Sequence, residues 1–175
     1  MPASRIVLIR AVNVGGAKLP MAELRDIATR IGATDVSTYI ASGNLLCTPP
    51  GHADAFDRAL EQAISDEFGY FREVISRSPD EVDAAIAAFA FGETQHGHLY
   101  FLTGTPEADA AAEFCARDFA NGERLAVVGR DLHIDYPNGA GKTQLNAKAI
   151  ERALGVTGTG RNLRTSAALV ERARA

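Results

Sequence analysis

Apolar positions in the first half of the chain alternate between short continuous runs and helical spacing. The run from Ile6 to Ile9 is apolar on both faces, which is typical of a central buried strand. Pro20 favours the start of a helix, and Gly32 ends the helical spacing. The pattern predicts a strand over residues 4–12, a helix over 20–31 and two strands over 35–41 and 45–48 that are joined by a hairpin turn. A helix over 52–69 and a strand over 71–76 follow. This βαββαβ order is the ferredoxin-like plan.

The second half follows a related pattern. Ser78 and Glu81 form a predicted capping box at the start of its first helix. The pattern predicts a helix over residues 78–89, a strand over 98–103, a helix over 105–119 and two strands over 124–128 and 131–136. A helix over 143–154 and a last helix from 165 onward follow. Thr165 is the predicted cap of the last helix, and a glycine-spaced loop precedes it.

These elements predict an α+β fold with a ferredoxin-like βαββαβ N-terminal half followed by a related α-βαββα C-terminal half. The predicted subdomains are residues 1–77 and 78–175, with the second packed on the first as one compact unit.

Charge and cysteine content narrow the class of protein. The 18 Lys and Arg residues against 22 Asp and Glu residues give a net charge of −4, which argues against a broad surface for nucleic acid or membrane. Cys47 and Cys115 lack metal-site spacing and are interpreted as core residues, which indicates a cytoplasmic location. Neither a signal peptide nor an apolar run near the ~20 residues of a membrane span is visible. We expect a cytoplasmic protein with no cofactor and no membrane partner, and leave its oligomeric state open.

The ferredoxin-like plan predicts where a site forms. A right-handed crossover makes the first two strands parallel, so the loop after the first strand and the hairpin after the second meet at one end of the sheet, where the fourth strand begins. Polar and flexible residues gather there. The candidate ligand-binding residues of this rim are Arg10, Asn13, Gly15, Gly16, Ser42, Asn44 and Arg72. An arginine, amides, a hydroxyl and glycine N–H groups suit a small anionic ligand, although turn formation alone also explains the glycines and asparagines.

These residues also carry a family resemblance. Three stretches resemble the motifs RGINVGG, MxxLR and TYIQSGN of the bacterial proteins collected as domain of unknown function family 1697: Arg10-Ala-Val-Asn-Val-Gly-Gly16, Met21-Ala-Glu-Leu-Arg25 and Thr38-Tyr-Ile-Ala-Ser-Gly-Asn44. The resemblance continues weakly to Arg161, Asn162 and Thr165. It implies an α+β fold with two ferredoxin-like parts and no established activity. The chain departs from the family pattern at Ala11, Gln144, Leu163 and Arg164.

A glycine-rich stretch in the second half resembles a nucleotide-binding P-loop. Residues 137–143 follow a strand and precede a helix, but Tyr136 stands where the first P-loop glycine is required. Two interpretations of this loop stay open: an anion contact by Lys142 and the helix N-terminus, or a glycine-rich loop with an exposed lysine. Arg161 and Asn162 complete the set of candidate ligand-binding residues.

Two histidine-bearing strands are interpreted as structural. His96 and His98 lack a third ligand at metal-site spacing, so no metal site is predicted. Asp131, His133 and Asp135 alternate with apolar residues, which predicts a solvated strand face. No nucleophile, histidine and acid stand in a recognisable catalytic pattern, so catalytic residues are not assigned.

Three functions stay open at this point. The first is binding of a small anionic ligand at the rim, where Arg10 pairs the anion, glycine N–H groups donate to it, and Ser42 and Asn44 orient it. The second is a protein-interaction or self-association module that uses the rim or a sheet edge. The third is an enzyme that acts on a phosphorylated or nucleotide-like substrate through Lys142 and Arg161.

Overall fold

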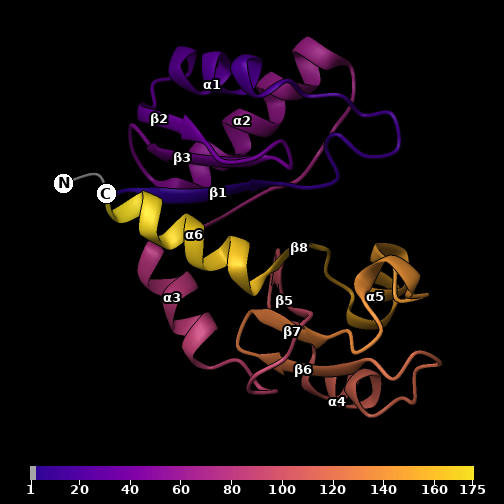
Figure 1. The fold of residues 1–175 in the computed structure, drawn as a ribbon. Coiled ribbons are helices and arrows are strands. Elements are labelled where there is room, and N and C mark those ends of the chain that lie inside the picture. Colours follow the sequence, from indigo (N-terminus) through magenta and orange to yellow (C-terminus); the bar gives the residue numbers. More distant parts are fainter. Residues whose placement is uncertain (1–2) are drawn as a thin grey trace. The chain divides into compact units, whose positions relative to one another are not determined.

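The structure is a computed structural model that describes residues 3–175. It contains two antiparallel four-stranded sheets, each accompanied by helices, which confirms the predicted α+β class with two similar halves (Figure 1). By its internal contacts the chain divides into two compact units: the residues up to Val82 together with Ala168–Ala175, and Asp83–Ala167. The predicted boundary at residue 77 falls near the first break, whereas residues 168–175 belong to the first unit.

The first unit has the predicted βαββαβ order. Its elements are β1 Arg5–Ile9, α1 Met21–Arg30, β2 Thr34–Thr38, β3 Asn44–Thr48, α2 Ala53–Phe68 and β4 Val74–Arg77. The sheet order is β2-β3-β1-β4, and each neighbouring pair is antiparallel. β1 and β2 therefore run in the same direction, as the crossover argument requires.

Both faces of β1 are buried because its apolar run is continuous. Val7 and Ile9 pack with side chains of α1 and α2 in the core of this unit, and Ile6 and Leu8 on the opposite face are equally inaccessible. The last turns of α6 also belong to this unit, where Arg172 lies over the Tyr39 ring at 4.4 Å.

The second unit has the same strand order as the first, with β8 (Gly158–Asn162) as its fourth strand. Its elements are α3 Pro79–Ala87, β5 Gly97–Leu102, α4 Ala108–Cys115, β6 Arg124–Val128, β7 Asp131–Asp135, the short 3₁₀ helix η1 Ala140–Lys142, α5 Ala147–Leu154, β8 Gly158–Asn162 and α6 Leu163–Arg174. The breaks between the two units fall within α3 and within α6. The order β6-β7-β5-β8 matches that of the first sheet. The capping box is present, because Ser78 N–H donates to Glu81 and Glu81 N–H donates to the Ser78 hydroxyl.

The prediction of a glycine-spaced loop before the last helix is wrong, because this segment forms the strand β8. β8 pairs with β5 from Gly158 to Asn162. A Cβ on Gly158 would lie 2.7 Å from a Tyr100 ring carbon, so the glycine lets the strand pass against this ring. Sparse apolar residues and two glycines hid the strand from the pattern.

Other predicted boundaries also require correction. The last helix begins at Leu163, and Asn162 rather than Thr165 caps it: the Asn162 side chain accepts the Thr165 N–H at 2.7 Å. The helix predicted over 143–154 begins at Ala147 instead, capped by Asn146. The predicted helix over 105–119 is shorter, as α4, and the fourth strand begins at Val74.

Candidate functional site

The predicted rim forms at one end of the first sheet. The Ile9 N–H donates to the Gly43 carbonyl at 2.9 Å, and the Arg10 N–H donates to the Glu73 carbonyl at 3.0 Å. These bonds bring together the end of β1, the β2–β3 connection and the start of β4. The hairpin turn is longer than predicted, because β2 ends at Thr38 and β3 begins at Asn44.

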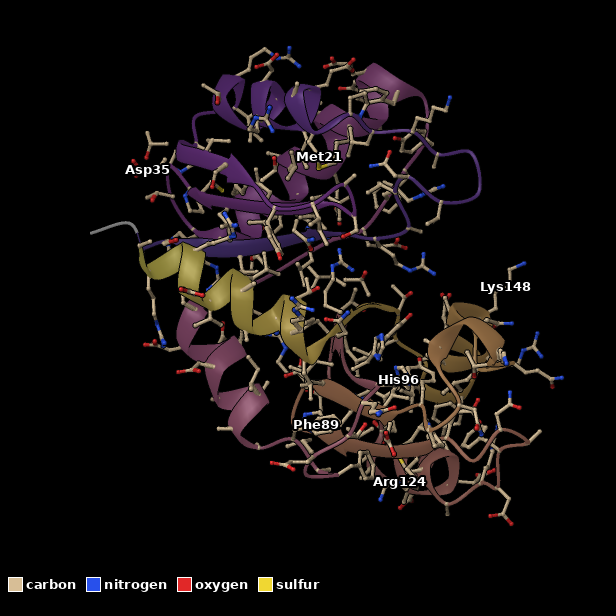
Figure 2. The ribbon with its side chains drawn as sticks, viewed as in Figure 1. Met21, Asp35, Phe89, His96, Arg124 and Lys148 are labelled. Carbon is tan, nitrogen blue, oxygen red and sulfur yellow. The ribbon has the colours of Figure 1, made fainter. Side chains whose placement is uncertain are left out.

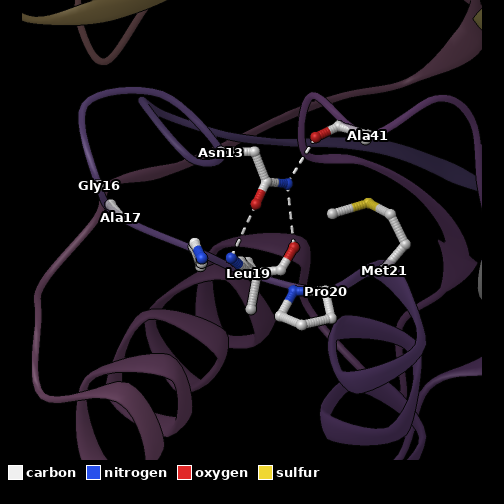
Figure 3. A pocket seen from close by; sticks show the side chains of 8 residues that line it. Asn13, Gly16, Ala17, Leu19, Pro20, Met21 and Ala41 are labelled. Carbon is white, nitrogen blue, oxygen red and sulfur yellow. Dashed lines mark hydrogen bonds between the residues drawn. The ribbon is translucent and has the colours of Figure 1, made fainter.

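Asn13 ties the β1–α1 loop to the β2–β3 connection (Figure 3). Its side-chain oxygen accepts the Leu19 N–H at 2.9 Å, and its amide nitrogen donates to the Leu19 carbonyl at 3.0 Å and to the Ala41 carbonyl. Between these contacts the chain makes a tight turn, closed by a β-bridge between Val14 and Ala17. Asn13 therefore fixes the loop, and its hydrogen-bonding groups are used within the protein.

A pocket of about 440 Å³ lies beneath this loop. It is lined by Asn13, Gly16, Ala17, Lys18, Leu19, Pro20, Met21 and Ala41. Figure 3 shows the Met21 side chain extending back toward the Asn13 amide. Most of the wall is apolar, and Lys18 is its only ionisable side chain. The equivalent connection of the second unit, between β5 and α4, spans only residues 103–107 against 10–20 here.

Positive φ angles occur in the loops next to this pocket. Ala11, Asn13 and Ile40 have φ angles of 52°, 57° and 50°, and of these three residues Asn13 lines the pocket; Asp35, in β2, has a φ angle of 53°. Such angles are unfavourable for side chains with a Cβ, most of all for a β-branched one, and persist where the surrounding structure enforces them. The Ile40 side chain is also 52% exposed, so burial does not explain its position.

The structure shows different environments for the predicted rim residues. Arg10 pairs with Glu73 at 3.1 Å, and Arg72 donates to the Ala11 carbonyl at 3.2 Å. Asn44 is fully buried and donates to Ser42 Oγ at 2.9 Å and to the Tyr39 carbonyl at 3.0 Å. These contacts build the loops.

Gly15 and Gly16 differ from the other rim residues. Both are exposed at the turn of the β1–α1 loop, with φ angles of +60° and +92°. Within the part of the chain that the structure describes, their N–H groups donate to no protein acceptor. They are open to solvent or a ligand.

Of the candidate residues of the second unit, Lys142 lies on η1, whereas Arg161 and Asn162 lie on β8. Lys142 ends η1 and is exposed. Arg161 is buried in β8, where it donates to Thr159 Oγ1 at 2.7 Å and to the Gly160 carbonyl at 2.8 Å, and burial lowers its pKa to about 10. Asn162 caps α6. Gly139 leads into a 3₁₀ turn instead of a phosphate loop, consistent with the missing P-loop glycine.

The predicted solvated face of β7 is wrong. His133 is fully inaccessible and Asp135 is 4% exposed. The Ala90 N–H donates to His133 Nδ1 at 3.2 Å, and the ring stacks on Phe89. Asp135 accepts from Arg124 at 2.7 and 3.0 Å and from Thr94 at 2.6 Å, and these bonds lower the pKa of its carboxyl against the opposing effect of burial. His133 and Asp135 are buried at alternate positions of β7 because each has a hydrogen-bond partner in the protein.

Within residues 3–175, no group of three or more histidines, cysteines, aspartates or glutamates could hold a metal ion. No helix in the described part of the chain is long and apolar enough to cross a membrane.

Sequence reasoning found the rim but missed the pocket beneath it. Lys18 and Leu19 fall between the predicted strand over 4–12 and the predicted helix over 20–31, Met21 falls in that helix, and Ile40 falls in the predicted strand over 35–41. The available signal was the spacing between Gly16 and Pro20, which leaves a loop long enough to arch over a hollow.

The fold and the pocket define a two-unit α+β protein, in which each unit is ferredoxin-like and the first carries a looped-out rim. Its structure is similar to that of the conserved bacterial protein SP0830 from Streptococcus pneumoniae, with a TM-score of 0.77, 20% sequence identity and coverage of 99% of both chains. The model of the DUF1697 family, described as a protein of unknown function, matches residues 3–133. The chain therefore belongs to the DUF1697 family. No curated protein matches its sequence.

Proposed function

We propose that this protein is a cytoplasmic ligand-binding protein, and that the pocket beneath the β1–α1 loop binds a small molecule carrying both an apolar part and an anionic group. The observation that carries the proposal is a hollow of about 440 Å³ lined by Asn13, which has a positive φ angle, with two further positive φ angles at Ala11 and Ile40 in the adjoining loops. Ligand pockets typically have volumes of this order, with mainly apolar walls and a few polar groups. Strained residues cluster at binding sites because the strain is part of the positioning of the site.

Different residues of the pocket wall would contact the apolar part and the anionic part of the ligand. Leu19 and Met21 supply apolar surface for its body. Lys18 supplies the positive charge, and the open N–H groups of Gly15 and Gly16 supply neutral donors to an oxyanion. Arg10, the predicted partner of the anion, supports the base of the loop through Glu73, and its direct contact with a ligand stays a prediction.

Ser42, Asn44 and Arg72 act indirectly in this proposal. They hold the β2–β3 connection and the segment before β4 against the loop. Their replacement would change the shape of the pocket rather than remove a ligand contact.

A second candidate function rests on exposed apolar side chains at the same rim. Val14, Ile40 and Phe71 are 61%, 52% and 54% exposed, and they lie on the segments that meet at this end of the sheet. Clustered apolar residues of this kind often mark a protein-interaction surface. Self-association through this rim is the alternative to a small ligand.

A thermal-shift screen tests the ligand proposal. The panel contains carboxylates, phosphate esters and nucleotides, each with and without an apolar substituent. A ligand at a hundred times its dissociation constant adds about 2.7 kcal/mol of stability. At this chain length each kcal/mol raises the midpoint by about 2–4 °C. We expect a rise of about 5–10 °C for a matching compound.

Two variants and a control locate the site. Lys18→Ala should abolish the shift of an anionic hit, and Met21→Glu should abolish it by placing a carboxylate in the wall. Lys148→Ala, an exposed lysine on α5 (Figure 2), should leave it unchanged. Equal losses in Lys18→Ala and Lys148→Ala, or a flat panel with folded protein, would contradict the proposal. If the panel is flat, the mass of the protein in solution should be measured at increasing concentration. A mass that rises with concentration for wild type, while Phe71→Ser stays monomeric, would support self-association.

A further inference from the structure

The second unit contains a pocket of its own, formed entirely by residues of that unit. Its volume is about 370 Å³, and its walls are residues 94–98, which lead into β5, and residues 162–164, at the junction of β8 and α6. His96 lies exposed beside it (Figure 2). The register of the sheet explains the juxtaposition, because His98 of β5 is paired with Asn162 of β8. The strand that sequence reasoning missed therefore builds one wall.

The wall combines basic and neutral polar side chains. Arg164 is a permanent cation, and His96, His98, Gln95 and Thr94 are imidazole, amide or hydroxyl groups. No aspartate or glutamate is among the lining residues. A chain with a net charge of −4 thus has a hollow lined by a cation and hydrogen-bond donors.

The carboxylate behind the wall is neutralised. Asp135 accepts from Thr94 at 2.6 Å and forms a two-nitrogen contact with Arg124, whose guanidinium also lies over the Phe91 ring at 4.7 Å. Asp135 is thus paired with Arg124 and Thr94, and Arg164 is exposed. Arg164 remains available to an external oxyanion, for which a guanidinium is the preferred protein partner.

The position of the His98 ring is fixed. Its Nδ1 lies 3.2 Å from the His96 carbonyl oxygen, and its edge packs on Tyr136 with ring centres 4.9 Å apart. A carbonyl oxygen only accepts, so Nδ1 carries the proton of this bond and Nε2 of the neutral ring is an acceptor. Burial lowers the pKa of His98, which favours that neutral ring. A ligand hydroxyl matches an acceptor of this kind.

We propose that the pocket formed by residues 94–98 and 162–164 binds the phosphate group of a small hydroxylated compound. Arg164 and His96 contact the phosphate oxygens, and His98 accepts a hydrogen bond from a hydroxyl of the same compound. This site shares no lining residue with the pocket beneath the β1–α1 loop, and the proposal does not depend on the function of that pocket.

Titration with inorganic phosphate, followed by backbone amide NMR at constant ionic strength, tests the proposal. The expected result is a saturable change at Gly97, His98 and Asn162. Arg164→Gln should weaken binding about tenfold, which corresponds to the loss of one charge-assisted contact. His96→Asn should weaken it less. Both positions are exposed, so the variants should fold.

Matched controls separate this site from other causes. Arg152→Gln removes an exposed charge from α5 and Lys18→Ala removes the cation of the first pocket, and neither should alter the changes at Gly97. A glycerol phosphate should bind more tightly than inorganic phosphate, since it adds a hydroxyl for His98. Equal weakening by Arg152→Gln would overturn the proposal in favour of general charge attraction. Changes confined to residues 13–18, or a response of Gly97 to zinc but not to phosphate, would also overturn it.

Discussion

Asp57 carries a buried carboxyl whose ionisation opposes folding. It lies on α2 with only 4% of its surface exposed. Its Oδ2 accepts a hydrogen bond from Ser76 Oγ at 2.7 Å, while its Oδ1 is buried without a partner. Burial raises the pKa of Asp57 from 3.8 to about 6, and the Ser76 hydrogen bond and the charges of Arg58 and Arg5 offset only part of this effect.

The direction of the pH effect follows from the raised pKa. The folded protein holds the proton more tightly than the unfolded chain, so the stabilising contribution is complete below pH 3.8 and is lost as the pH rises through about 6. A shift from 3.8 to about 6 corresponds to about 3 kcal/mol, because one pKa unit is 1.36 kcal/mol. Wild-type protein should lose about this amount relative to Asp57→Asn between pH 4 and pH 7.

Urea unfolding of both proteins, followed by circular dichroism from pH 3.5 to 8, measures this difference. Subtracting the two curves removes the contributions of groups that the proteins share, including Asp135 and Glu123, whose lowered pKa values act in the opposite direction. Asp109→Asn, an exposed change on α4, is the control because Asp109 is not among the charges that act on Asp57, and it should not reproduce the loss. Parallel curves for wild type and Asp57→Asn, or a carboxyl ¹³C titration midpoint near 4, would refute the reasoning.

Two further predictions concern close packing and thiol chemistry. Gly158→Ala should destabilise the protein by about 1–3 kcal/mol in urea unfolding, because the new Cβ would overlap the backbone carbonyl oxygen of Phe101 and the Tyr100 ring. Gly141→Ala, where a Cβ meets open space, should change little, and equal effects would refute the clash. Burial raises the pKa of Cys47 to about 12, so at pH 8 only about one thiol in 10⁴ is ionised. Mass spectrometry after iodoacetamide treatment should find Cys47 unmodified in folded protein and modified in urea, and rapid labelling without urea would contradict its burial.

Local patterning was sufficient to predict the first unit. The continuous apolar run of β1 and the helical spacing after Pro20 have strong periodicity, and the handedness of the crossover then fixed which loops meet. The gathering of Arg10, Asn13 and Asn44 at one end of the sheet followed from topology alone. The same reasoning could not show that Glu73 pairs with Arg10, because that contact depends on side-chain positions across two strands.

The second unit was harder to predict because tertiary packing replaces local pattern there. β8 has little apolar character of its own and is a strand because β5 offers it an unpaired edge. His133 and Asp135 alternate like surface residues, yet Phe89 stacks on the buried His133 ring, and Thr94 and Arg124 donate hydrogen bonds to Asp135. Polar alternation in a sequence thus distinguishes a solvated face from a satisfied buried face only when the partners are known.

The assignment of Ala168–Ala175 to the first unit affects the order in which the protein is completed during synthesis. A ribosome makes the whole of Asp83–Ala167 before it makes the residues that finish the first unit. The first unit therefore lacks Leu169 and Val170, both of which are buried in the finished protein, until all of Asp83–Ala167 has been made. The segment made first is not finished early, and apolar surface of the first unit stays open to chaperones while the second unit is synthesised.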